Sequence, residues 1–118
     1  MRVTADIFVR ALMRRAEGEG AFAHVARRGA HEAGAIHVLV DDLSGNLSLY
    51  GPAIGGWDRD EADGMDDRRF TLLRETADRA DIAAWLERET RFDADLWLIE
   101  VEDRQGRSFL DPETLIEE

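Results

Sequence analysis

Residues 96–102, with the sequence Leu-Trp-Leu-Ile-Glu-Val-Glu, constrain the fold of this chain more than any other segment. The segment has the length of a strand, and its apolar side chains occupy both odd and even positions. Successive side chains of a strand point to opposite faces of a sheet, so this pattern predicts a strand that is apolar on both faces. Such a strand is typical of a central position that is covered on both sides.

Two other segments, residues 4–17 and 78–91, have the apolar periodicity of amphipathic helices. Thr4 and Asp78 are suited to cap them, because a side-chain oxygen at this position accepts a hydrogen bond from a free backbone N–H group. The buried stripe that we predict for the second helix consists of Ile82, Trp85 and Leu86.

Four further segments are predicted as strands: residues 21–27, 35–41, 46–50 and 69–75. Between the second and third of these, residues 42–45 (Asp-Leu-Ser-Gly) predict a tight hairpin loop, with Gly45 available for a positive φ.

The order of these elements predicts one α+β domain over residues 1–118. We expect a largely antiparallel sheet of about five strands, with both main helices on one face. Residues 51–68 form a long, glycine-containing acidic loop in this prediction. Its acidic residues do not follow the EF-hand pattern, so we interpret the loop as solvated.

The charge of the chain limits its partners. There are 26 acidic and 15 basic side chains, which gives a net charge of −11. Phosphate backbones and anionic lipids repel such a protein, so we expect neither a nucleic-acid nor a membrane partner.

Neither cysteine nor lysine occurs, which excludes disulfides, thiolate metal ligands and Schiff-base chemistry. No apolar run is long enough to span a bilayer and no signal peptide is recognisable, so we expect a soluble, cytoplasmic protein.

Two stretches are similar to a known family. One runs from Gly34-Ala35-Ile36 to Leu49-Tyr50-Gly51-Pro52-Ala53. The other is RFDADLWLIEVEDR over residues 91–104, followed by Gly106-Arg107 and Phe109-Leu110. They resemble the small, uncharacterised bacterial proteins called domain of unknown function 1491. The resemblance covers most of the chain and implies a single small bacterial domain, without an activity.

Few residues have the chemistry of a polar site. His37 and Asp41 share one face of a predicted strand, and Glu100 can join them from residues 96–102. These three residues form the site of our alternative function, a small-molecule-binding or hydrolytic protein with the 51–68 loop as a lid. If His24 lies on a neighbouring strand, His24, His37 and Asp41 could hold a metal ion. No spacing motif requires such a site, and we predict no catalytic residue, metal or cofactor.

The leading functional hypothesis is a non-enzymatic interaction module. Two helices on one face would leave the other face of the central strand uncovered, and exposed apolar patches mark interfaces. We therefore predict a homodimer, or a complex with another protein, through Trp97, Ile99 and Val101. The competing interpretation is that residues 109–116 fold back over this face.

Overall fold

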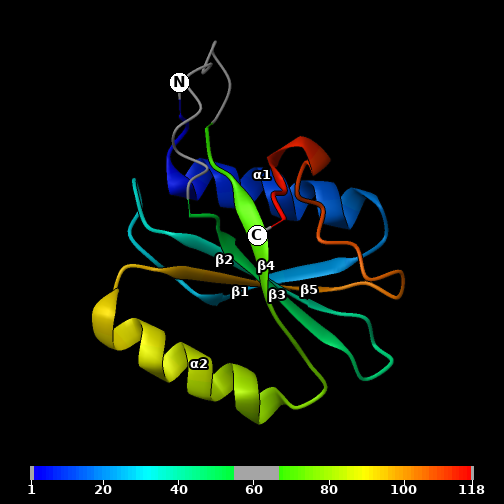
Figure 1. The fold of residues 1–118 in the computed structure, drawn as a ribbon. Helices are drawn as coiled ribbons and strands as arrows, with labels where there is room; N and C mark the ends of the chain where they lie inside the picture. The colour runs from blue at the N-terminus through cyan, green and yellow to red at the C-terminus, as the bar shows by residue number, and fades with distance from the viewer. Residues whose placement is uncertain (1, 55–66, 118) are drawn as a thin grey trace.

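The computed structural model describes residues 2–54 and 67–117. Every predicted helix and strand is present, with ends within about two residues of the prediction. In chain order these are α1 (Ala5–Gly18), β1 (Phe22–Arg27), β2 (Ile36–Asp41), β3 (Leu47–Pro52), β4 (Phe70–Thr76), α2 (Arg79–Phe92) and β5 (Trp97–Glu102), followed by a 3-10 turn, η2 (Pro112–Thr114). All five strands form one sheet, which confirms the α+β fold class (Figure 1).

The last strand in the sequence lies inside the sheet. The strand order is β1-β5-β2-β3-β4. Strand β5 pairs antiparallel with β1 and parallel with β2, whereas the two remaining pairs are antiparallel. The central position predicted for residues 96–102 is therefore confirmed, and β5 separates β1 from β2.

The two helices cover opposite faces of the sheet (Figure 1). Helix α1 packs with the face that carries Val38 and Ile99, whereas α2 packs with the face that carries Leu39 and Leu98. The prediction of both helices on one face is thus wrong. The physical reason is that β2 and β5 are apolar on both sides, so each face of the sheet needs a helix to exclude water.

Local signals in the sequence account for the ends of the elements. The hydroxyl of Thr4 accepts a hydrogen bond from the backbone N–H of Ile7 at 3.3 Å, and the carboxylate of Asp78 accepts one from Ala80 at 2.9 Å. Gly45 has a φ of 98° in the β2–β3 hairpin.

Most of the predicted acidic loop, residues 55–66, lies outside the described residues. Neither of the two described α-helices is long and apolar enough to cross a membrane.

Candidate functional site

Three carboxylates gather where the parallel strands β2 and β5 end. Asp41 lies opposite Glu102 in the register of the two strands, and Glu100 precedes Glu102 by two residues. The three side chains therefore project from the same face, the one that α2 covers. One oxygen atom from each lies within 4.8 Å of the others. Glu100 is buried, whereas Asp41 and Glu102 are half-buried.

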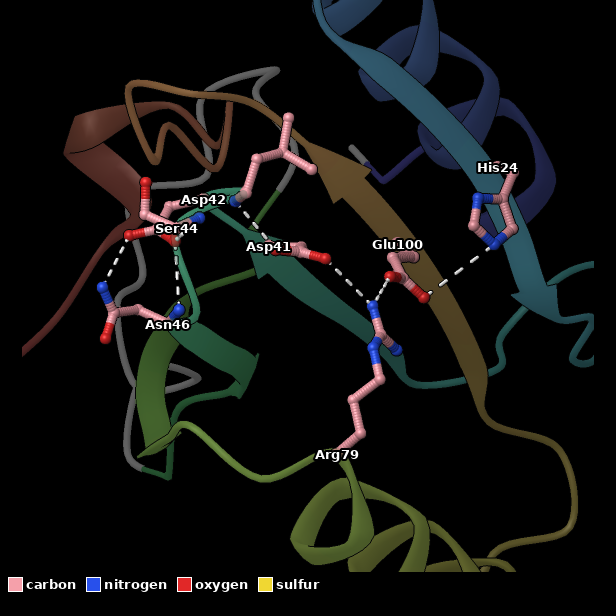
Figure 2. Close-up of polar contacts among 8 residues, drawn as sticks. His24, Asp41, Asp42, Ser44, Asn46, Arg79 and Glu100 are labelled. Atoms are coloured by element: carbon pink, nitrogen blue, oxygen red, sulfur yellow. Dashed lines mark hydrogen bonds and ion pairs between the residues drawn. The ribbon is translucent and has the colours of Figure 1, made fainter.

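Arg79 neutralises two of these carboxylates (Figure 2). It is the first residue of α2, and its Nη2 atom donates hydrogen bonds to Asp41 Oδ2, at 3.1 Å, and to Glu100 Oε2. The hydrogen bond to Glu100 is the largest cause of a raised pKa for Arg79, and the contact with Asp41 adds to it. The guanidinium is therefore positively charged at physiological pH.

His24 approaches the same cluster from β1. Its Nε2 atom lies 3.9 Å from Glu100 Oε1, across the β1–β5 pair (Figure 2). Strand β1, which carries His24, is therefore a neighbour of β5 and not of β2, which carries His37 and Asp41. Because β5 intervenes, the alternative metal site of His24, His37 and Asp41 does not assemble, and that hypothesis is wrong.

His37 lies apart from the carboxylates. It precedes Asp41 by four residues on β2, about 13 Å at ~3.3 Å per residue. Its ring packs edge-on against Trp85, with 5.0 Å between the ring centroids. Burial lowers the pKa of His37 to about 4, and the Trp97 backbone and the charge of Asp93 only partly oppose this effect. His37 is therefore a neutral core side chain at physiological pH.

The predicted polar site is thus assembled only in part. The structure brings Asp41 and Glu100 together but leaves His37 out, because strand geometry separates residues that share a face. Arg79 occupies the space between the carboxylates that a cation would take, so the cluster anchors the first turn of α2 to the sheet. The sequence patterns above do not single out Arg79. One feature of the sequence does point to a special role for Arg79: it is a cation in the first turn of a helix, where the helix dipole favours anions.

The residues predicted to form an interface lie in the core. Trp97 is 1% exposed, and Ile99 and Val101 are fully buried beneath α1. The indole N–H of Trp97 donates a hydrogen bond to the carbonyl of Ala30 at 2.8 Å, which satisfies its one polar atom. The prediction of an interface on these three residues is wrong because α1 covers the face that was expected to be bare. The segment after β5 adds Leu110 to the same core.

A different apolar surface remains exposed at the edge of the sheet. Strand β1 pairs only with β5 among the described strands, so its outer backbone edge is unpaired. Phe22 is 72% exposed at the start of this strand, and Val25 and Ala26 are also exposed. None of the six residues of β1 is acidic.

The comparison with protein families agrees with the fold and with the resemblance in the sequence. A family described as "Protein of unknown function (DUF1491)" matches residues 3–111 of the chain. The chain belongs to the DUF1491 family. No curated protein matches it.

Solved structures show the same DUF1491 fold. A crystal structure of a DUF1491 family protein from Caulobacter crescentus CB15 has a TM-score of 0.78 and 38% identity, and the match covers 98% of this chain and 99% of that one. An NMR structure of a DUF1491 family protein from the same organism has a TM-score of 0.75 and 42% identity over 98% of both chains. A solution structure of a protein from A. tumefaciens has a TM-score of 0.78 and 40% identity, covering 100% of this chain and 98% of that one.

Proposed function

We propose that this DUF1491 protein is a non-enzymatic interaction module that associates with a second copy of itself through the outer edge of β1. The observation that carries the proposal is the exposed, acid-free edge strand with Phe22 at its start. An unpaired strand edge presents a row of N–H and C=O groups that another strand can complete.

The two edges of the sheet differ in whether another segment covers them, and this difference supports the β1 edge as the contact surface. At the other edge, the backbone N–H of Ile116 donates a hydrogen bond to the carbonyl of Phe70 at 2.7 Å, and Leu115 forms a β-bridge with Phe70. The C-terminal segment therefore covers the beginning of β4. In the described parts of the chain, no segment pairs with β1 on its outer side in this way.

The distribution of charge favours a second copy as the partner. Two molecules that each carry a net charge of −11 repel each other, and the repulsion at close contact is weakest where the contact surface lacks acidic groups. Strand β1 meets this condition, because none of its residues is acidic and it contains the cation Arg27. Antiparallel pairing of two β1 strands about a two-fold axis would give an isologous interface, the commonest arrangement in soluble homo-oligomers.

Sedimentation equilibrium from about 10 to 300 μM protein tests the proposal. We expect the average mass to rise above 13.3 kDa with concentration. Phe22→Glu and Ala26→Glu should each return it towards the monomer, because each adds to both copies a carboxylate that would lose its water in the interface. The matched control is Phe92→Glu, which changes a phenylalanine at the end of α2 that is even more exposed, at 88% against 72% for Phe22. A monomer at all concentrations, or equal effects of Phe22→Glu and Phe92→Glu, would reject association through β1.

A further inference from the structure

A second surface of the protein has the shape of a small-molecule site. A groove of about 740 Å³ lies between α1 and residues 107–114, on the opposite side of the sheet from α2. This volume is within the range of roughly 300–1,000 Å³ that is typical of ligand pockets. The apolar part of its wall consists of Phe8, Phe109, Leu110 and Pro112, and Arg15 of α1 lies beside them.

Two arginines hold one wall of this groove in an unusual conformation. Phe109 has a φ of 64°, in the left-handed region that residues other than glycine rarely adopt. Arg15 Nε and Nη2 donate hydrogen bonds to the Phe109 carbonyl at 3.2 and 2.9 Å. The guanidinium of Arg107 lies 4.8 Å from the centre of the Phe109 ring. Arg15 thus holds the Phe109 backbone and Arg107 packs on its ring, and backbone strain of this kind is concentrated at binding sites.

Among the described residues that line the groove, Arg15 is the charged side chain that remains available to a ligand. A guanidinium has five N–H groups, and Arg15 uses two of them on Phe109. The other charged groups at the groove have protein partners. Arg107 binds both carboxylate oxygens of Asp103 at 2.9 Å and also contacts Glu19. Asp111 accepts a hydrogen bond from the backbone N–H of Glu113 at 3.0 Å.

We infer that this groove binds a small aromatic carboxylate. The ring of the ligand would pack against Phe8, Phe109 and Pro112, and its carboxylate would accept hydrogen bonds from the unused N–H groups of Arg15. A planar guanidinium matches a carboxylate with two parallel hydrogen bonds, and an aromatic ring favours offset or edge contacts with phenylalanine. This site is independent of the β1 edge, so either proposal can fail without the other.

NMR titration of the ¹⁵N-labelled full chain with 2-naphthoate tests the inference. The matched ligand is 2-naphthamide, which has the same ring system and no charge. We expect shift changes at α1 and residues 107–114, and an affinity for naphthoate about tenfold above that for the amide. Arg15→Met should abolish this difference, whereas Arg14→Met, which removes the adjacent exposed arginine outside the groove, should preserve it.

Three outcomes would overturn the inference: no saturable shifts in the groove, equal binding of naphthoate and naphthamide, or equal effects of Arg14→Met and Arg15→Met. If Arg15→Met does not give a folded spectrum, Arg15→Lys supplies the test, because it keeps the charge but loses the planar pair of donors. It should then reduce the preference for naphthoate, and an unchanged preference would also count against Arg15. Phe22→Glu should leave naphthoate binding unchanged.

Discussion

The two faces of the sheet are covered by helices of equal length in different ways. Helices α1 and α2 each have 14 residues. Helix α1 buries four apolar residues, Ala5, Val9, Leu12 and Ala16, against a face of β2 and β5 that is apolar along its whole length. Helix α2 buries two, Ile82 and Trp85. The face beneath α2 is apolar in the middle, with His37 at one end and the carboxylates at the other.

This difference shows that one sheet can hold its two helices by different forces. Removal of apolar surface from water accounts for the attachment of α1. Helix α2 has less of this contribution, and the ion pairs of Arg79 with Asp41 and Glu100 hold its first turn. Core truncation should therefore have its largest effect on the α1 face. A change of pH or salt should act on the α2 face.

The largest expected effect is that of Leu12→Ala in α1. Leu12 is fully buried, so its truncation should lower the free energy of unfolding by about 2–5 kcal/mol. Leu86→Ala in α2 is the comparison, because the structure places Leu86 as a half-buried residue and not in the core that the sequence predicted. We expect a loss of about 1–2 kcal/mol for Leu86→Ala, since less surface is removed from water. Urea unfolding of both variants measures this, and equal losses would contradict the asymmetry of the two faces.

The next effect is the pH dependence that His37 contributes. Its pKa is about 4 in the folded protein and 6.5 in the unfolded chain, so the unfolded state binds a proton first as the pH falls. The stabilisation by neutral His37 is fully present above pH 6.5 and is lost between pH 6.5 and 4, by about 3 kcal/mol over the whole range.

Urea unfolding at a series of pH values, with His37→Phe as the comparison, measures this contribution. The carboxylates titrate in both proteins, so the difference between the two pH profiles isolates His37. We expect the variant to lose less stability than the wild type between pH 6.5 and 4. Parallel profiles would mean that His37 is accessible to solvent.

The smallest effect is expected for Arg79→Met. Arg79 is partly exposed, so solvent screens its ion pairs, and its removal should cost about 1 kcal/mol at low salt. The loss should shrink at 1 M NaCl, because salt also screens the repulsion between the carboxylates that remain. Arg88→Met, at an exposed position of the same helix, is the control, with an expected change within about 0.5 kcal/mol. Thermal or urea unfolding of both variants at two salt concentrations measures these changes. Equal, small losses for Arg79→Met and Arg88→Met would show that Arg79 is an ordinary surface charge and does not hold α2 on the sheet.

Part of the candidate site could be predicted from the sequence. The sequence predicts Asp41 and Glu100 as site residues because Asp41 shares a strand face with His37 and Glu100 is a carboxylate on the strand over residues 96–102, and the structure brings these two carboxylates together. His37 was assigned to the same site because it shares a strand face with Asp41, but the rise along a strand separates them. The interface at Trp97 was wrong for a related reason, since the pattern of β5 shows that both faces need cover but does not say what covers them.

The sequence by itself determined the helices, the strands, the hairpin at Gly45 and the central place of β5. These features follow from local periodicity, from capping side chains and from the backbone preference of glycine, which operate within a few residues. Only the tertiary structure decided that β5 inserts between β1 and β2, that the helices take opposite faces, and that Arg79 meets Asp41 and Glu100. The physical reason is that these outcomes depend on burying both faces of one sheet at once, a condition that no short segment of the chain contains.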